Sequence, residues 1–224
     1  MEPKTLDHVA FWVQDREPLV DFATRHLGMH VIDSQEAFSL IGSDARRGKL
    51  TLFSAEGPRE RGAIKHVALR VSDLERARAA LPDRAGHEVE LGEGIRVKLV
   101  EARTDVDYDL DHVALFTENP AGTAEAYTEL GFESASPSED GHPRVEVGGA
   151  YIEFHRGAPG SPEKPLLNHL AVLVDSADEH TEEAEAMGIV DNVVEAANTR
   201  AVFVWGPDRV RVEYVEHKPE FSLR

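Results

Sequence analysis

The stretch LDHVALFT at residues 110–117 recurs with small changes along the chain. Residues 6–13 read LDHVAFWV, residues 64–71 read IKHVALRV and residues 167–174 read LNHLAVLV. Each is a short apolar run rich in β-branched residues, which is typical of a buried β-strand. Self-similarity at a regular spacing indicates repeated structural units. The chain therefore contains four copies of one unit, and each copy opens on a strand.

The residues that follow each opening strand repeat as well. A segment with helical periodicity comes next and closes on a glycine, a residue that favours the end of a helix; these glycines are Gly28, Gly86, Gly131 and Gly188. Short alternating runs separated by turn residues then predict three antiparallel strands. The unit is thus β-α-β-β-β, which gives an α+β fold of four βαβββ modules.

One such module is too small to bury the faces of its own sheet, so the modules must pair. We expect two domains, residues 1–104 for the first two modules and residues 105–224 for the last two. The acidic stretch EARTDVDYD at residues 101–109 is the expected seam between them.

Composition narrows the range of functions. The 224 residues include 42 acidic and 24 basic side chains, a formal net charge of −18, which disfavours nucleic acid and anionic membranes as partners. No apolar run reaches the length of a membrane span and the N-terminus is polar, so we expect a cytoplasmic protein. The absence of cysteine excludes thiolate ligands and cysteine nucleophiles, so any metal must bind to His, Asp or Glu.

A histidine occupies the third position of every opening strand; the four are His8, His66, His112 and His169. A single histidine in an apolar strand is usually a hydrogen-bonded core residue. The last strand of each module adds a second observation. Aligning GKLTLFS, GIRVKLVE, GAYIEFHR and RVRVEYVE on their apolar alternation gives four equivalent central positions, which are Thr51, Lys98, Glu153 and Glu213.

An inward-facing glutamate costs several kcal/mol unless it is paired or bound to a cation. Glutamates occupy the central position only in the last two modules, which predicts a cation site there. Its expected ligands are His112, Glu153, His169 and Glu213, which suit one Fe(II), Mn(II), Ni(II) or Zn(II) ion per chain with open positions for water or substrate. The first two modules offer only Thr51 and Lys98 beside their histidines, so we expect them to be metal-free.

The four modules, the strand motif hydrophobic-x-His-hydrophobic and the closing VEYVE resemble the vicinal oxygen chelate superfamily over essentially the whole chain. This superfamily includes glyoxalase I, bleomycin and fosfomycin resistance proteins, methylmalonyl-CoA epimerase and extradiol dioxygenases. The resemblance implies curved mixed sheets that enclose a cleft, a small-molecule substrate and, as is common in the superfamily, a homodimer.

Four modules in one chain most resemble the extradiol dioxygenases. That resemblance implies Fe(II) held by His112, His169 and Glu213, and a catecholic or other substrate with two neighbouring oxygens. The sequence departs from the family in two places, because Phe203 stands where a tyrosine is expected and residues 193–199 contain no histidine. His155 is then a candidate acid–base group, and Phe203 and Trp205 are candidate walls of the substrate pocket.

Two alternatives stay open at this point. A complete His/Glu/His/Glu set, with Glu153 as fourth ligand, would favour a redox-neutral isomerase or lyase of the glyoxalase I kind. The fold is also used by non-catalytic proteins that bind antibiotics, and a small-molecule binding protein of the bleomycin resistance type is the second alternative.

Overall fold

The computed structural model describes residues 1–44, 47–82, 86 and 88–219. In these ranges each repeat forms one module. The first two modules comprise β1 (Thr5–Val13), α1 (Arg16–His26), β2 (His30–Ser34), β3 (Phe38–Asp44) and β4 (Arg47–Ser54), then β5 (Ile64–Val71), α2 (Leu74–Ala80), β6 (Glu88–Gly92) and β7 (Ile95–Glu101). The last two comprise β8 (Asp109–Thr117), α3 (Pro120–Glu129), β9 (Glu133–Ala135), β10 (Arg144–Val147) and β11 (Ala150–Arg156), then β12 (Leu167–Leu173), α4 (Ala177–Met187), β13 (Val190–Glu195), β14 (Thr199–Trp205) and β15 (Arg211–His217).

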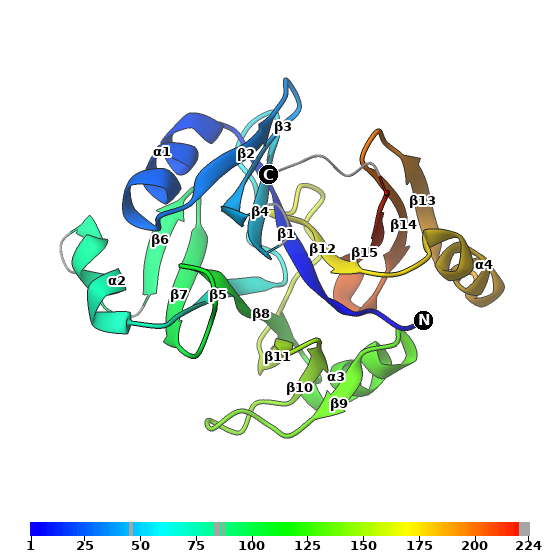
Figure 1. The fold of residues 1–224 in the computed structure, drawn as a ribbon. Coiled ribbons are helices and arrows are strands. Elements are labelled where there is room, and N and C mark those ends of the chain that lie inside the picture. Colours follow the sequence, from blue (N-terminus) through cyan, green and yellow to red (C-terminus); the bar gives the residue numbers. More distant parts are fainter. Residues whose placement is uncertain (45–46, 83–85, 87, 220–224) are drawn as a thin grey trace.

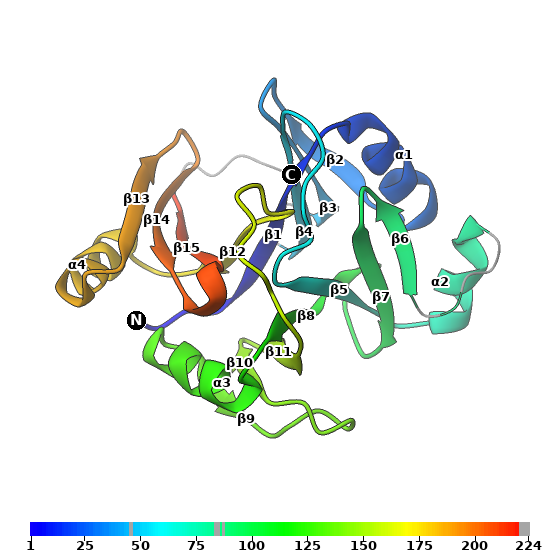
Figure 2. The same ribbon diagram turned by 180° about the vertical axis from the view of Figure 1, so that it is seen from behind.

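The helices begin where a short polar side chain follows the first strand of each module. Each cap accepts a hydrogen bond from a backbone N–H of the first turn, and the four caps are Asp15, Asp73, Asn119 and Ser176. Helix α4 ends on the left-handed Gly188, as expected, whereas α2 ends at Ala80, well before Gly86. All four helices lie on the outside of the molecule (Figures 1 and 2). No helix in the described ranges is long and apolar enough to cross a membrane.

The strands form two curved mixed sheets, which confirms the expected fold of four modules in two vicinal-oxygen-chelate units (Figure 1). The first sheet has the order β13-β14-β15-β12-β1-β4-β3-β2. The second sheet has the order β6-β7-β5-β8-β11-β10-β9, and in the described residues its second module contributes two strands after the helix rather than three. Each sheet is built around an antiparallel pair of opening strands, β1 with β12 and β5 with β8.

This strand order corrects the expected pairing of modules. The first module shares a sheet with the fourth and the second with the third, so residues 1–104 and 105–224 are not separate sheets, and residues 101–109 link two modules of the same sheet. The chain passes between the sheets in residues 55–63 and 157–166, where the Leu166 amide donates to the Glu60 carbonyl at 2.6 Å. Four similar modules carry no signal in sequence for which opening strands pair, which is why the pattern alone could not choose.

The residue before each repeated histidine is an extra residue in the strand ladder. The register between β1 and β12 skips Asp7 on one strand and Asn168 on the other. The register between β5 and β8 likewise skips Lys65 and Asp111. A β-bulge of this kind bends the strand and re-aims a side chain. These residues therefore reach the same concave face as the histidines that follow them.

The turn between β10 and β11 packs against the segment that leads into β1. Gly148 and Gly149 both have positive φ, 54° and 82°. A Cβ atom on Gly148 would overlap the Lys4 carbonyl oxygen, whereas one on Gly149 would meet nothing within 4 Å. We expect Gly149→Ala to lower the free energy of unfolding by about 1–2 kcal/mol through backbone strain. Gly148→Ala should cost about 1–3 kcal/mol more through overpacking. Urea unfolding of both variants tests this, and equal losses would contradict the packing described.

Candidate metal centre

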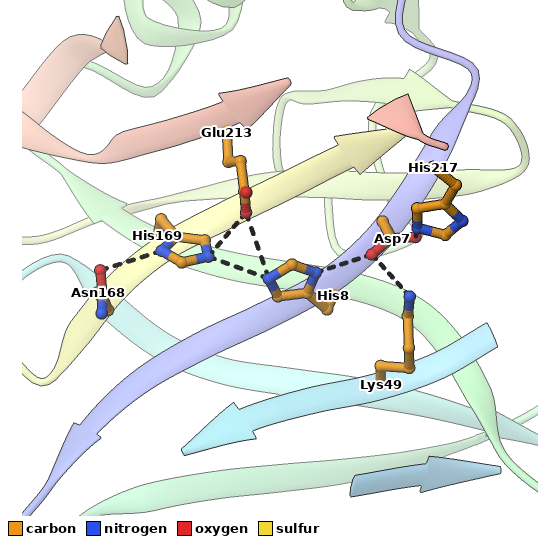
Figure 3. A network of polar contacts seen from close by, with 7 residues as sticks. All are labelled: Asp7, His8, Lys49, Asn168, His169, Glu213 and His217. Atoms are coloured by element: carbon orange, nitrogen blue, oxygen red, sulfur yellow. Dashed lines mark hydrogen bonds and ion pairs between the residues drawn. The ribbon is translucent and has the colours of Figure 1, made fainter. Parts of the chain in front are cut away.

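Three side chains from three strands meet on the concave face of the first sheet (Figure 3). His8 comes from β1, His169 from β12 and Glu213 from β15, so the first and fourth modules both contribute. The two histidine Nε2 atoms lie 3.0 Å apart. Glu213 Oε2 lies 3.0 Å from His169 Nε2 and 3.3 Å from His8 Nε2. All three side chains are largely buried.

The hydrogen bonds of the two imidazoles determine where their protons lie. His8 Nδ1 is 2.8 Å from Asp7 Oδ1, and an ionised carboxylate can only accept, so Nδ1 carries the proton. His169 Nδ1 donates in the same way to Asn168 Oδ1 at 3.0 Å. When the rings are neutral, both Nε2 atoms therefore carry a lone pair and no proton. Glu213 Oε2 is buried and accepts no hydrogen bond. Three acceptors without a proton between them repel one another unless a cation lies among them, so the donor set fits a metal ion.

The spacing of the three atoms indicates a coordination geometry. With metal–ligand bonds of about 2.1 Å, neighbouring ligands are about 3.0 Å apart in an octahedron and about 3.4 Å apart in a tetrahedron. Two of the three distances between the Nε2 and Oε2 atoms are 3.0 Å, and the third is 3.3 Å. These distances are in the range of ligands that share one ion, and a 2-His-1-carboxylate set would leave further positions for substrate.

The buried carboxylate of Asp7 contacts His8, one of these three side chains. Asp7 Oδ1 lies 2.8 Å from Lys49 Nζ, and Asp7 Oδ2 lies 3.1 Å from His217 Nε2. Burial alone would raise the pKa of Asp7, but the Lys49 ammonium and hydrogen bonds from His217 and His8 outweigh it and hold this pKa well below its usual value. Asp7 therefore stays ionised near neutral pH. It keeps the proton of His8 on Nδ1 and leaves the Nε2 lone pair for a metal.

The ligands themselves are held in the protonation state that binds metal. Burial lowers the pKa of His169, and the nearby Glu213 carboxylate only partly opposes this shift. Burial would raise the pKa of Glu213, but His169 outweighs that effect and the pKa lies below its usual value. Neutral imidazole and ionised carboxylate are the forms that coordinate divalent ions.

The three ligands line a pocket of about 600 Å³. Aromatic and apolar side chains form much of its wall; they include Trp12, Phe38, Leu40, Phe53, Phe203 and Val215. Phe203 packs edge-on against the His169 ring, with centroids 5.2 Å apart, and the Arg211 guanidinium lies 4.1 Å from the Phe203 centroid. Polar side chains line the pocket as well, and Lys49, Thr51 and His217 are among them. Such a lining suits one small molecule with an apolar body.

The four ligands expected from sequence are divided between the two sheets. His169 and Glu213 meet in the first sheet, but their third partner is His8, not His112. His112 and Glu153 lie on β8 and β11 of the second sheet. His8 of the first module thus belongs to a grouping with the spacing of metal ligands, where the sequence led us to expect none. The cause is the pairing of modules, because each centre draws one histidine from each of two paired opening strands.

The other expected site residues are also placed by the structure. His155 lies in the second sheet, where its Nε2 is 2.7 Å from Glu153 Oε1, so it cannot be the acid–base group of the first centre. Phe203 lines the pocket, as expected. Trp205 is 43% exposed and its indole N–H donates to Asp191, so it is not a wall of that pocket.

The second sheet repeats the arrangement only in part. The Nε2 atoms of His66 and His112 lie 3.1 Å apart, much as in the first sheet. Glu153, the counterpart of Glu213, bonds instead to His155. Ligand atoms of His142, Glu153 and His155 lie within 4.8 Å of one another, which is a second grouping with the spacing of metal ligands.

Sequence reasoning missed His8 as a member of this grouping and missed the residues around it, which are Asp7, Lys49 and His217. One signal was present, since an Asp or Asn precedes three of the four repeated histidines. In a regular strand neighbouring side chains point to opposite faces, so this signal becomes readable only once the β-bulges are known.

Comparison with known proteins gives matches in one family and one fold. Residues 5–107 match the model of the glyoxalase/bleomycin resistance protein/dioxygenase superfamily, which confirms the resemblance seen in the sequence. A Bacillus subtilis protein described as a "putative dioxygenase" is 15% identical with a TM-score of 0.82, covering 98% of this chain and 87% of that one. Zea mays glyoxalase I is 15% identical with a TM-score of 0.72, over 95% and 92% of the two chains. The cppA protein of Streptococcus pneumoniae is 13% identical with a TM-score of 0.63, over 96% and 98%. At these identities the similarity shows the fold alone, and a comparison with curated proteins finds no match.

Proposed function

Because residues 5–107 match the glyoxalase/bleomycin resistance protein/dioxygenase superfamily and the whole chain has its fold, we propose that the first sheet is a metal-dependent catalytic site. His8, His169 and Glu213 would hold one divalent ion. The substrate is a small molecule with two neighbouring oxygen atoms. The observation that carries this proposal is the meeting of two imidazole Nε2 atoms and one carboxylate oxygen, 3.0–3.3 Å apart, in the wall of a pocket.

Within the superfamily, a ring-cleaving dioxygenase of the extradiol kind that uses Fe(II) is the first candidate. Three protein ligands on one face suit a catecholate that chelates through two oxygens together with dioxygen. A fourth protein ligand would favour glyoxalase chemistry, but Thr51 stands at that position in the first sheet and Glu153 lies in the second. The aromatic walls suit a planar ring.

The protein groups around the metal position can bind, orient and deprotonate such a substrate. When bound, the metal would act as a Lewis acid that lowers the pKa of the substrate hydroxyls. His217 Nε2 lies 3.1 Å from Asp7 Oδ2, so this carboxylate orients the imidazole that would accept a substrate proton. Lys49 would stabilise the resulting oxyanion. His217 thus takes the role that the missing late histidine leaves open.

A redox-neutral isomerase or lyase is the second candidate. The Asp7, Lys49 and His217 cluster could move a proton between neighbouring carbons without dioxygen, which is the observation in its favour. A metal-free binding protein, the third alternative, leaves the buried lone pairs of the ligands without a counter-charge.

We expect the protein reconstituted anaerobically with Fe(II) to consume dioxygen with a catechol and release a yellow ring-fission product. His217→Gln should lower kcat by about 10²-fold or more while metal content is unchanged, because only proton transfer is lost. Oxygen-electrode and absorbance assays over a panel of catechols test this. Turnover of a hemithioacetal with Ni(II) or Zn(II), and none of catechols with Fe(II), would instead select the isomerase.

A further inference from the structure

The second sheet differs from the first in how its polar groups are satisfied. The bulge residue before His66 is Lys65, where the other three modules have Asp or Asn. Lys65 Nζ lies 3.0 Å from His155 Nδ1, and His155 Nε2 lies 2.7 Å from Glu153 Oε1. An amine, an imidazole and a carboxylate therefore lie in one hydrogen-bonded row, which we name the Lys65 relay.

The protons in this row can be assigned by elimination. A lysine ammonium can only donate, so His155 Nδ1 is an acceptor and the ring proton is on Nε2, where it is donated to Glu153. In the neighbouring pair, His112 donates from Nδ1 to Asp111 and accepts on Nε2 from His66, while His66 Nδ1 is buried without a hydrogen bond. Glu153 Oε1 therefore accepts a hydrogen bond from His155, whereas Glu213 Oε2 of the first sheet accepts none.

Burial favours a reactive amine at Lys65. Burial lowers the pKa of Lys65, and the nearby Lys98 and Arg61 add to this effect while Glu153 and Glu88 oppose it. The Glu153 carboxylate stays ionised, since burial would raise its pKa but His155 and His112 lower it to about 2. An imidazole held by a carboxylate and hydrogen-bonded to a nucleophile is the arrangement of a catalytic triad.

We propose that the Lys65 relay is a second, metal-free reactive site, in which the Lys65 amine forms an imine with a small anionic aldehyde or ketone such as a 2-oxo acid. His155 Nδ1 takes a proton from the Lys65 ammonium, and the freed amine nitrogen forms a bond to the carbonyl carbon. The carbonyl π electrons move to oxygen, which takes the proton back from His155. The nitrogen then loses a second proton, which His155 passes to the hydroxyl, so that the hydroxyl leaves as water while the second C–N bond forms and a protonated imine remains. No oxidant or reductant is needed.

The charge around the amine specifies the class of substrate. Lys98 and Arg61 are cations close enough to affect the pKa of Lys65, so a carboxylate or phosphate on the substrate would be attracted to them. The His142 ring, whose centroid is 3.8 Å from that of His155, packs over the imidazole of the relay.

Trapping with a small anionic aldehyde tests the proposal. The intact protein is treated with glyoxylate and cyanoborohydride at pH 7, and labelled lysines are identified by peptide mass spectrometry. The chain has six lysines, and exposed Lys164 provides the internal reference. We expect Lys65 to be labelled about 100-fold faster than Lys164, which is the scale of general acid–base assistance.

Matched variants distinguish assistance by His155 and Glu153 from a high reactivity of Lys65 that is due only to its exposure. Lys65→Arg should remove the label while metal content at the first centre and the melting temperature stay unchanged. Glu153→Gln and His155→Gln should slow labelling of Lys65 towards the rate of Lys164 without changing Lys164 itself. The proposal is overturned if Lys65 reacts no faster than Lys164, or if both relay variants leave its rate unchanged. It is also overturned if His155→Gln releases a second bound metal ion.

Discussion

Glu213→Ala is expected to abolish metal binding, whereas Glu153→Ala leaves one metal ion per chain. The two glutamates occupy equivalent positions in their modules, next to Ala171 and Ala114 of the adjacent opening strands. Only Glu213 faces two histidine lone pairs, at 3.0 and 3.3 Å. Losing even an outer partner of a metal ligand costs about 10–100-fold in affinity, so loss of the ligand itself should cost more than about 100-fold.

The histidines provide a matched pair for the same prediction. His8→Ala should remove the metal and His66→Ala should retain it, because His8 has Asp7 to hold its proton on Nδ1 while His66 Nδ1 is buried without a hydrogen bond. Metal content after gel filtration and chelator competition are the measurements. Retention of the metal in His8→Ala together with its loss in His66→Ala or His112→Ala would place the centre in the second sheet.

Asp7→Asn is expected to have the largest effect on stability. Asp7 and Lys49 form a buried ion pair 2.8 Å long, with side chains 2% and 3% exposed. Removing one charge leaves the Lys49 ammonium buried without compensation, which costs about 3–5 kcal/mol of unfolding free energy. The same substitution weakens the hydrogen bond that keeps the proton of His8 on Nδ1. The affinity for metal should therefore fall about 10–100-fold.

A double variant separates the two consequences of Asp7→Asn. Asp7→Asn with Lys49→Met should recover much of the lost stability, because no unpaired charge remains, but should not recover metal affinity. Urea unfolding of metal-free protein and metal competition measure the two effects. If the double variant is no more stable than Asp7→Asn alone, the buried pair is not the source of the loss.

The depressed pKa of Asp7 also sets the sign of a pH dependence. A carboxyl group with a lower pKa in the folded than in the unfolded state stabilises the fold fully above its unfolded value, about 3.9. That contribution is lost as the pH falls from there through the folded value. The metal-free wild-type protein should therefore lose stability on acidification below about pH 4 more steeply than Asp7→Asn does.

The repeating elements of the fold could be read from the sequence because each module repeats the same local chemistry. The alignment of Thr51, Lys98, Glu153 and Glu213 agrees with the strand register. Each of these residues lies beside the alanine two positions after its module's histidine; the four alanines are Ala10, Ala68, Ala114 and Ala171. Alternating apolar residues fix such register, since a slip of one residue would expose the buried face.

The composition of the site could not be read in the same way, because it depends on contacts between modules. The choice of His8 rather than His112 as the partner of His169 follows from the pairing of β1 with β12, which is set by tertiary packing. The role of Asp7 depends on a β-bulge, and the bond between Glu153 and His155 depends on Lys65. None of these has a signature within a single module.

Anomalous diffraction at the absorption edge of the bound metal tests the central claim most directly. For crystals of the protein loaded with one equivalent of Fe(II), we predict one anomalous peak, in contact with His8 Nε2, His169 Nε2 and the Glu213 carboxylate. A peak between His142, Glu153 and His155, or at His66 and His112, with none in the first sheet would contradict the assignment of the centre to the first and fourth modules.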